Sequence, residues 1–564
     1  MSHNQNKQTL TDQELVQKWC DQPAPLLPIL HAFHDRDGFV SESAMRTISL
    51  ALKIPLAELF GTVSFYHHLS QSPPGQSAPR VCDGPVCRLR GSRQLLAELS
   101  DQNATQMPCA GRCDDFIPVL KGAEVLIGTT ADNLQVCPSP LPPPNPGQTE
   151  ECVFSQIRQP NRSTVLGYRQ TGGYDGFIRM LDLMRPADVI HALEDSQLAG
   201  RGGASFPTGL KWKTVAEEKR GPKTIVCNAD EGEPGCFKDR AIMDYDPHAV
   251  IEGMLIAAYA TGANQGFIYL RYEYPETLNI LAQAIEEAQM SGFLGDSILG
   301  SDFDFQIHIR RGAGSYICGE ETALLNSLEG KRPFPRNRPP YPVTNGFQDL
   351  PTAVNNVETL ASVPQILRNG AEWYRGLGLN GHSGTKIISL SGDIQYPGNY
   401  EIPIGLPLST LLYDWAGGAT SGREVQAVTM AGVSGGFLAK KDLDVKLDNQ
   451  SVTEKGSILG SGGVIVFDDS RNMVEVAANA MEFFAEESCG KCFPCRIGTQ
   501  RLTERLTMNP PIPSKEVWLT EVKEIGQTMK ATSACGLGSV APLITDSLIN
   551  YFPDQIERYL DRQE

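Results

Sequence analysis

The segment Glu487-Ser488-Cys489-Gly490-Lys491-Cys492-Phe493-Pro494-Cys495-Arg496 carries three cysteines at C-x2-C-x2-C spacing, and Cys535 provides a distant fourth. A [4Fe-4S] cluster requires four thiolates. A structural zinc ion with four cysteine ligands is the alternative, but zinc ribbons pair their cysteines two and two. Three closely spaced cysteines with one separate partner therefore favour the cluster.

A second set of four cysteines lies nearer the N-terminus, as the C-x4-C pair Cys82 and Cys87 and the C-x3-C pair Cys109 and Cys113. Glycine and proline around both pairs allow loop backbone to curl so that its N–H groups bond the sulfurs. This arrangement suits a [2Fe-2S] cluster; zinc remains the alternative, although these spacings are unusual for zinc knuckles. Helical spacing over 92–99 and short apolar runs near 117–120 and 125–127 predict a small α/β unit.

Composition limits the classes of function. A chain of 564 residues is long enough for three or four domains, and its net charge of −17 argues against sequence-independent binding to nucleic acid or to an anionic membrane. The start of the chain is polar and no apolar run reaches 18 residues, so we expect a cytoplasmic protein. Fourteen cysteines without an export signal favour metal ligands and free thiols over disulfides.

Residues 11–75 show helical apolar spacing and predict a small helical bundle, with Ser41 or Ser43 as a helix N-cap. Four histidines in this region lack the partner spacing of a metal site, so we expect them at the surface or at its boundary: His31, His34, His67 and His68. This helical lead-in, followed by C-x4-C and C-x3-C, resembles the thioredoxin-like, 24-kDa-type subunit of respiratory complex I. In that family the four cysteines hold a [2Fe-2S] cluster.

A glycine-rich loop at 198–212 contains four glycines and Lys211, an arrangement that can present backbone N–H groups to a phosphate. It is not the dinucleotide fingerprint, because Ser205 stands where the last glycine would be and no strand precedes it. A buried-strand pattern at 223–226 leads into Asn228, Asp230, Glu231 and Glu233, and a second strand at 305–310 precedes the glycine-rich stretch 312–322. Polar groups at the carboxyl ends of strands suit the hydroxyls of a ribityl or ribose group; solvated turns are the alternative.

These segments together resemble the flavin-bearing, 51-kDa-type subunit of complex I and the diaphorase subunits of NAD-reducing hydrogenases and NAD-dependent formate dehydrogenases. The resemblance covers about 165–555 and implies an oxidoreductase with FMN, NAD, a [4Fe-4S] cluster and a [2Fe-2S] cluster. It implies no catalytic side chain, because hydride passes directly to FMN. By this resemblance the FMN is lined by Gly200, Arg201, Gly202, Lys211, Asn228, Asp230, Glu231, Gly319, Glu320, Asn355 and Asn356.

The same resemblance places the nicotinamide nucleotide at Phe206, Glu233, Glu321, Arg338 and Tyr341. Arg338 stands where the family commonly has lysine, and a guanidinium can bind a nucleotide phosphate through two hydrogen bonds. We expect Glu320 and Glu321 to orient the flavin and to favour NAD by repelling the additional phosphate of NADP. The resemblance assigns the clusters to Cys82, Cys87, Cys109 and Cys113, and to Cys489, Cys492, Cys495 and Cys535.

The predicted fold is α/β and multidomain. Its expected parts are an N-terminal helical bundle (1–75), a thioredoxin-like [2Fe-2S] domain (76–137), a proline-rich linker (138–150), an FMN- and NAD(H)-binding domain (151–383), a ubiquitin-like β-grasp domain (384–467) and a helical bundle with the [4Fe-4S] cluster (468–564). We expect Asp468 to Ser470 to start the last bundle, and its loops to carry all four cluster cysteines.

Three segments look closest to formate dehydrogenase β subunits: 246–256, 269–275 and 462–468. This resemblance implies electron transfer between NAD and a catalytic α subunit that carries a molybdenum or tungsten pterin and further iron-sulfur clusters. The diaphorase subunit of a hydrogenase and a fused complex I subunit are the alternatives. A zinc-stabilised interaction scaffold would be a different class of protein.

Overall fold

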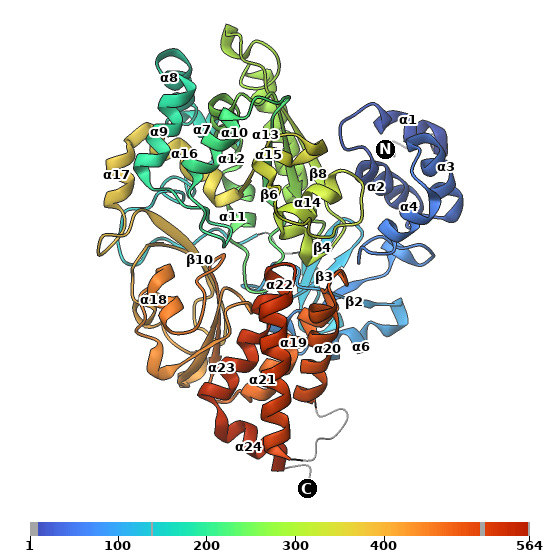
Figure 1. The fold of residues 1–564 in the computed structure, drawn as a ribbon, viewed down its shortest axis with the longest axis vertical. Helices are drawn as coiled ribbons and strands as arrows, with labels where there is room; N and C mark the ends of the chain where they lie inside the picture. The colour runs from blue at the N-terminus through green and yellow to red at the C-terminus, as the bar shows by residue number, and fades with distance from the viewer. Residues whose placement is uncertain (1–9, 137–138, 508–513, 562–564) are drawn as a thin grey trace.

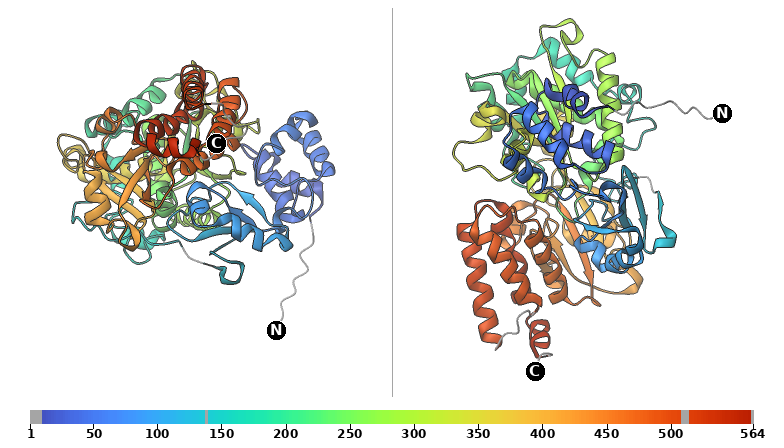
Figure 2. Two further views of the ribbon diagram at one scale, coloured as in Figure 1. Left: turned by 90° about the horizontal axis from the view of Figure 1, so that it is seen from below. Right: turned by 90° about the vertical axis from the view of Figure 1, so that its right-hand side faces the viewer.

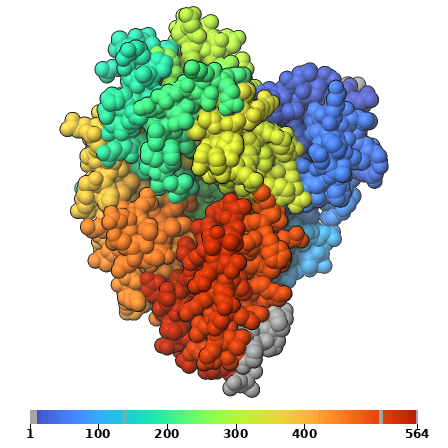
Figure 3. Space-filling view, viewed as in Figure 1, coloured from blue at the N-terminus to red at the C-terminus, as the bar shows by residue number. Residues whose placement is uncertain are grey.

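The computed structural model describes residues 10–136, 139–507 and 514–561. An α/β domain forms one end of the molecule, the C-terminal helices form the opposite end, and the β-grasp region lies beside both (Figures 1 and 3). This architecture confirms the predicted α/β multidomain fold. The expected domain boundary at residues 137 and 138 lies outside the described residues.

The central domain contains a parallel four-stranded sheet in the order β8-β7-β6-β9. The register pairs Asn228 of β6 with Asn356 of β9, so the polar residues at the carboxyl ends of these strands meet at one edge. The strands are β6 (Thr224–Ala229), β7 (Gln265–Leu270), β8 (Gln306–Arg311) and β9 (Thr352–Asn356). The helices are α7 (Val165–Gln170), α8 (Asp175–Leu183), α9 (Pro186–Ser196), α10 (Thr208–Glu217), α11 (Lys238–Tyr245), α12 (Pro247–Thr261), α13 (Pro275–Met290), α14 (Glu321–Leu328), α15 (Pro342–Asn345), α16 (Val357–Asn369) and α17 (Ala371–Gly376).

This sheet is buried on both faces, as parallel sheets usually are. Side chains on one face, such as Ile225 and Ile268, join the core formed with α12 and α16. Side chains on the other face, such as Val226 and Phe267, join the core of the N-terminal helices. The N-terminal helices therefore serve as the second covering layer of the sheet (Figure 2).

The N-terminal helices are α1 (Asp12–Cys20), α2 (Leu26–Asp37), α3 (Glu42–Leu52) and α4 (Leu56–Val63). Ser41 caps α3 by accepting a hydrogen bond from the N–H of Ala44, as predicted. The expectation of surface histidines is wrong for three of the four, because His31, His34 and His68 are buried between these helices and the central domain. His31 Nε2 lies 2.9 Å from the carbonyl oxygen of Arg311.

The buried histidines make the packing of this layer sensitive to acid. Burial lowers the pKa of His34 to about 3 and also lowers the pKa values of His31 and His68. An unfolded histidine titrates near pH 6.5, so below that pH the unfolded chain binds more protons than the folded chain. The stabilisation is complete above pH 6.5. It falls by up to about 1.4 kcal/mol per pH unit for each histidine as the pH drops toward the folded pKa values.

We expect the protection of α2 against hydrogen exchange to fall between pH 6.5 and 5, and His34→Gln to reduce that pH dependence. His191 provides a matched control because its side chain is 73% exposed on α9. His191→Gln should leave the pH profile as in the parent protein. If His34→Gln and His191→Gln behaved alike, the buried imidazole would not be the acid-sensitive group.

The thioredoxin-like domain contains a five-stranded sheet in the order β2-β1-β3-β4-β5. Its elements are β1 (Arg80–Cys82), α5 (Pro85–Leu89), α6 (Ser92–Glu98), β2 (Thr105–Met107), β3 (Ile117–Lys121), β4 (Glu124–Gly128) and β5 (Gln135–Val136). The predicted helix and both predicted strands are present. The ends of β1 and β2, which run parallel, lead into the two cysteine pairs.

The next region has a five-stranded sheet in the order β11-β10-β14-β12-β13, with β10 and β14 parallel at its centre, in agreement with a β-grasp. Its elements are β10 (Thr385–Gly392), β11 (Gly398–Pro403), a wide helical turn at Thr410–Trp415, β12 (Val425–Met430), β13 (Phe437–Ala439), α18 (Asn449–Glu454) and β14 (Gly463–Asp468). Glu401 of β11 accepts hydrogen bonds from the N–H groups of residues 152–154, which fastens the chain after the proline-rich segment to this sheet.

The C-terminal bundle consists of α19 (Met473–Glu486), α20 (Phe493–Thr507), α21 (Lys515–Thr532), α22 (Gly536–Val540), α23 (Pro542–Tyr551) and α24 (Pro553–Asp561). Asn472, and not a residue of 468–470, caps α19 by accepting a hydrogen bond from the N–H of Val474. The expected start was wrong because Asp468 still belongs to β14. Among the described residues no helix is both long enough and apolar enough to span a bilayer.

Candidate functional site

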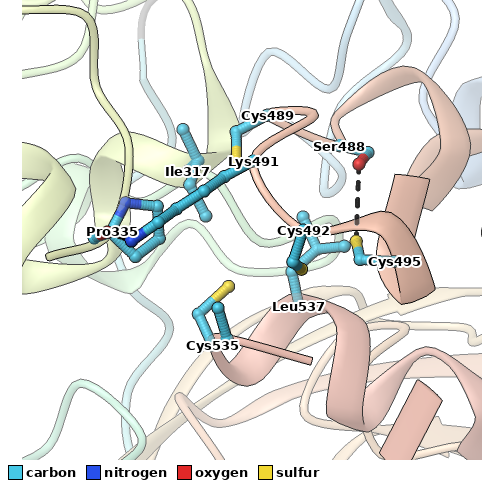
Figure 4. Close-up of a pocket in the computed structure, with 10 residues that line it drawn as sticks. Ile317, Pro335, Ser488, Cys489, Lys491, Cys492, Cys495, Cys535 and Leu537 are labelled. Atoms are coloured by element: carbon cyan, nitrogen blue, oxygen red, sulfur yellow. Dashed lines mark hydrogen bonds between the residues drawn. The ribbon is translucent and has the colours of Figure 1, made fainter. Parts of the chain in front are cut away.

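The four cysteines of the C-terminal set converge on one space. They line a small cavity together with Ile317, Pro335 and Leu537 (Figure 4). Cys489 and Cys492 lie in the loop before α20 and Cys535 caps α22, but Cys495 lies inside α20. The expectation that all four stand on loops is therefore wrong for Cys495, because α20 begins at Phe493, directly after the second cysteine.

Close packing brings the two parts of this set together. A Cβ atom on Gly538 would lie 2.8 Å from Cys495 Cβ, so only glycine lets α22 approach α20 this closely. Burial raises the pKa of Cys495 to about 12 and that of Cys535 to about 11. These thiols are neutral at pH 7 unless a metal binds the sulfur, which fits ligands whose deprotonation is coupled to metal binding.

The second cysteine set is also assembled by the fold. Cys82 ends β1, Cys87 lies in α5, and Cys109 and Cys113 lie in the loop after β2. The Sγ atoms of Cys109 and Cys113 are 3.5 Å apart, and the N–H of Ala110 donates to Cys82 Sγ at 3.3 Å. The predicted contact between loop N–H groups and sulfur is therefore present.

The arrangement of both sets bears on the zinc alternative. Across residues 10–136, 139–507 and 514–561, no three Cys, His, Asp or Glu side chains are placed to bind a single metal ion. The four cysteines of the C-terminal set line one common cavity. Each cysteine in the described part of the chain is a free thiol, as expected.

The carboxyl edge of the central sheet gathers the predicted flavin residues. The Nδ2 atom of Asn228 donates to the carbonyl oxygen of Gly319 at 2.8 Å. A Cβ atom on Gly202 would lie 3.0 Å from the Cβ of Asn356, so the glycine-rich loop passes close to the end of β9. Asp230 is buried and its Oδ2 atom has no hydrogen-bond partner, which leaves an acceptor at this edge for a ligand hydroxyl.

The residues predicted at the nicotinamide nucleotide are partly exposed. Lys211 Nζ lies 5.9 Å from the centre of the Phe206 ring and 3.6 Å from Glu321 Oε2. Arg338 Nη2 lies 3.1 Å from Glu321 Oε1 and also pairs with Glu320. The rings of Phe206 and Tyr341 are 46% and 53% exposed, so both present apolar surface to an incoming nucleotide.

Three predicted FMN residues have side chains that the protein itself engages. The guanidinium of Arg201 donates to Tyr374 Oη at 2.7 Å, and Asn355 Oδ1 accepts a hydrogen bond from the Trp212 indole at 2.9 Å. The carboxylate of Glu231 accepts hydrogen bonds from the backbone N–H groups of Asp239 and Arg240. These side chains hold the loops in place, and the Nε atom of Arg201 remains without a hydrogen-bond partner.

Glu233 connects the central domain to the β-grasp region. Its carboxylate accepts hydrogen bonds from Tyr316 Oη at 2.6 Å, Ser434 Oγ at 2.7 Å and the Val433 N–H at 2.8 Å. Burial raises the pKa of Glu233 to about 7. The sequence analysis did not single out Tyr316 or Ser434. Tyr316 lies within the glycine-rich stretch 312–322, whereas nothing in the sequence marks Ser434.

Comparisons with known families agree with this geometry. The thioredoxin-like [2Fe-2S] ferredoxin model matches residues 12–121, the Nuo51 FMN-binding domain model matches 193–365, and the NADH-ubiquinone oxidoreductase-F iron-sulfur binding region matches 475–559. The chain thus carries a [2Fe-2S] domain, an FMN domain and a [4Fe-4S] region, and it is an NAD-linked oxidoreductase subunit.

Individual relatives cover most of the chain. The NADP-reducing hydrogenase subunit HndC of Solidesulfovibrio fructosivorans is 45% identical over 69% of this chain and 79% of its own length. The NAD-reducing hydrogenase HoxS subunit alpha of Cupriavidus necator is 32% identical over 98% of this chain and 94% of its own. A crystal structure of an NAD+-reducing [NiFe]-hydrogenase superposes with a TM-score of 0.80 at 31% identity, covering 96% of this chain and 93% of that one. The chain therefore belongs to the family of NADH-dehydrogenase-type diaphorase subunits found in NAD-linked hydrogenases and in complex I, with its [2Fe-2S], FMN and [4Fe-4S] parts on one polypeptide.

Proposed function

We propose that this chain is the diaphorase subunit of an NAD-dependent formate dehydrogenase. In this proposal it passes electrons between NAD and a catalytic α subunit that carries a molybdenum or tungsten pterin and further iron-sulfur clusters, so that formate and NAD+ yield CO2 and NADH. The observation that carries it is the resemblance of 246–256, 269–275 and 462–468 to formate dehydrogenase β subunits. These segments correspond to most of α12, the end of β7 with the loop after it, and β14.

FMN, when bound, accepts two electrons as hydride and releases them singly, which links NAD to one-electron iron-sulfur clusters. We propose that the glycine-rich loop and the polar edge formed by Asn228, Asp230 and Asn356 hold it. Phe206, Glu321, Arg338 and Tyr341 would orient the nicotinamide nucleotide at the open side. Glu233, fixed by Tyr316 and Ser434, would keep the β-grasp region closed over the site and so exclude water.

The proposed ligand sets are Cys82, Cys87, Cys109 and Cys113 for the [2Fe-2S] cluster, and Cys489, Cys492, Cys495 and Cys535 for the [4Fe-4S] cluster. The second set lies beside the flavin domain, because Lys491 Nζ donates to the carbonyl oxygen of Pro335 and lies 3.0 Å from Asn337 Oδ1. This placement supports the [4Fe-4S] cluster as the exit for single electrons toward the partner subunit.

A hydrogenase diaphorase is the second candidate, and one observation favours it. The hydrogenase relative and the hydrogenase structure both cover at least 96% of this chain, including its N-terminal helices. In that case the partner would carry a hydrogen-activating metal site in place of a pterin.

Assays of the native complex distinguish formate from hydrogen as the electron donor. We expect formate to drive NAD+ reduction by the purified complex, hydrogen to be inactive, and elemental analysis to find molybdenum or tungsten in the partner subunit. To distinguish a wrong donor from an inactive preparation, the same assays are repeated on complex that has first been reduced with NADH and then reoxidised. Hydrogen-driven NAD+ reduction without formate activity would contradict the proposal and favour the hydrogenase.

A further inference from the structure

The loop that carries Cys109 and Cys113 makes several polar contacts with the central domain. Arg112 in this loop donates to Glu276 of α13 at 2.7 Å. Arg240 of α11 donates to Asp114 in the same loop at 3.1 Å. Buried guanidinium groups therefore cross the boundary between the two domains in both directions.

A third guanidinium, that of Arg271, reaches the backbone of a predicted cluster ligand. Arg271 follows β7, and its Nη2 donates to the carbonyl oxygen of Cys109. Its Nη1 donates to the carbonyl oxygen of Glu231, within the polar stretch after β6. One side chain thus connects the predicted [2Fe-2S] loop with the loop that follows the central strand.

The position of Arg271 is tightly constrained. Its Nε donates to Glu273 Oε2 at 3.1 Å, and the guanidinium lies 5.0 Å from the centre of the Tyr274 ring. Gly111, in the cysteine loop, adopts a positive φ of 65°, and a Cβ atom there would lie 2.8 Å from Arg271 Nη1. The cysteine loop is therefore shaped to admit this guanidinium.

Arg271 keeps its charge although it is only 4% exposed. A guanidinium is not deprotonated in proteins, and the carboxylate of Glu273 pairs with it. Arg271 and Cys109 line a small cavity at this junction together with the carboxyl groups of Asp230, Glu273 and Glu487. A permanent cation therefore lies beside Cys109 in a space from which bulk water is largely excluded.

We propose that Arg271 is a positioning residue for the [2Fe-2S] site, which fixes the backbone of Cys109 against the central domain and supplies a positive charge beside the cluster. The proposal rests on Cys82, Cys87, Cys109 and Cys113 as the ligand set. Reduction adds one negative charge to such a cluster, so a nearby cation favours the reduced form and raises the midpoint potential. Hydrogen bonds and charge outside the ligand set tune clusters in this way.

The test is an EPR-monitored redox titration of the full-length holoprotein. Arg271→Gln should lower the midpoint potential of the [2Fe-2S] signal so that the ratio of reduced to oxidised cluster falls about tenfold at a given potential, a shift of about 59 mV for one electron. The midpoint potential of Arg271→Lys should lie between those of the parent protein and Arg271→Gln, because lysine keeps the charge but lacks the planar set of donors of arginine. The midpoint potential of the [4Fe-4S] cluster should stay unchanged.

Arg310 offers a matched control. It is buried, it stands on the neighbouring strand β8, and its Nε donates to the carbonyl oxygens of Pro23 and Ala24, so it also connects the N-terminal region to the central domain. Arg310→Gln should leave the [2Fe-2S] potential unchanged. An unchanged potential in Arg271→Gln at full iron content, or an equal shift in Arg310→Gln, would overturn the proposal.

Cluster content provides a second measurement if the variants lose cofactor. Loss of the [2Fe-2S] cluster alone from Arg271→Gln, with FMN and the [4Fe-4S] cluster retained, would support the positioning role. Loss of all three groups from both Arg271 variants would contradict it, since the residue would then serve general folding. In the same series, an unaltered [2Fe-2S] signal in Cys109→Ala, which supplies no ligand atom at this position, would refute the ligand set itself.

Discussion

Cys535→Ser is expected to stop electron exchange with the partner subunit while NADH still reduces bound FMN. Cys535 caps α22 and comes from a different segment of the chain than Cys489 and Cys492, and no fifth cysteine lines the cavity to replace it (Figure 4). Loss of a second-sphere partner of a metal ligand already costs roughly 10- to 100-fold in affinity or activity, and loss of the ligand itself should cost at least that much. Stopped-flow bleaching of the flavin by NADH measures the reduction of FMN. Reduction of an added one-electron acceptor separately measures the transfer of electrons out of the protein.

Cys20→Ser is the matched control for this variant. Cys20 is a free thiol at the end of α1, outside both cysteine sets, so its replacement should leave both rates as they are in the parent protein. If NADH no longer reduced the flavin in a folded, FMN-loaded Cys535→Ser protein, the proposed order of carriers would be wrong.

Glu321→Ala is expected to raise kcat/KM for NADPH by about tenfold, which corresponds to about 1.4 kcal/mol, while NADH turnover changes much less. The carboxylate of Glu321 lies 3.1 Å from Arg338 and 3.6 Å from Lys211. Its removal ends the repulsion of the additional phosphate and leaves Arg338 paired with Glu320 alone, so that the guanidinium has more donors available for that phosphate. Steady-state kinetics with each nucleotide measure the change.

Two further variants isolate the cause. Glu194→Ala removes a carboxylate of α9 that also lies 3.6 Å from a lysine, Lys213, but forms no ion pair with Arg338 or Lys211, so it should not change nucleotide preference. Adding Arg338→Ala to Glu321→Ala should return NADPH activity toward the parent value if this guanidinium binds the phosphate. Unchanged rejection of NADPH in Glu321→Ala would exclude repulsion as its role.

Much of the site could be predicted from sequence because its signals are local. The spacing of Cys489, Cys492 and Cys495 and the apolar run before Asn228 arise within a few residues of chain; in the structure the cysteines line one cavity and the apolar run forms β6. The burial of His31 and His34 could not be predicted in this way. Helix α2 packs its apolar face within the N-terminal layer, and its histidines are covered only because that layer also lies on the central sheet.

The directions in which side chains point could not be predicted from the sequence either. Asn355 and Asn356 are adjacent in β9, so their side chains point to opposite faces of the sheet. Asn356 caps α16 at the carboxyl edge, whereas Asn355 faces Trp212 in the core. The family resemblance includes both residues, but only the geometry of the sheet determines which of the two side chains faces the site.

The sequence by itself determined the eight cluster cysteines as candidates, the glycine-rich loop, the polar strand ends and the order of the domains, because each depends on spacing along the chain. The tertiary structure alone decided which groups meet across domains: Glu233 with Ser434, Lys491 with Pro335, and Arg271 with Cys109. These contacts join residues far apart in the sequence, and they form because buried charges and polar groups must find partners wherever the packed domains bring them together.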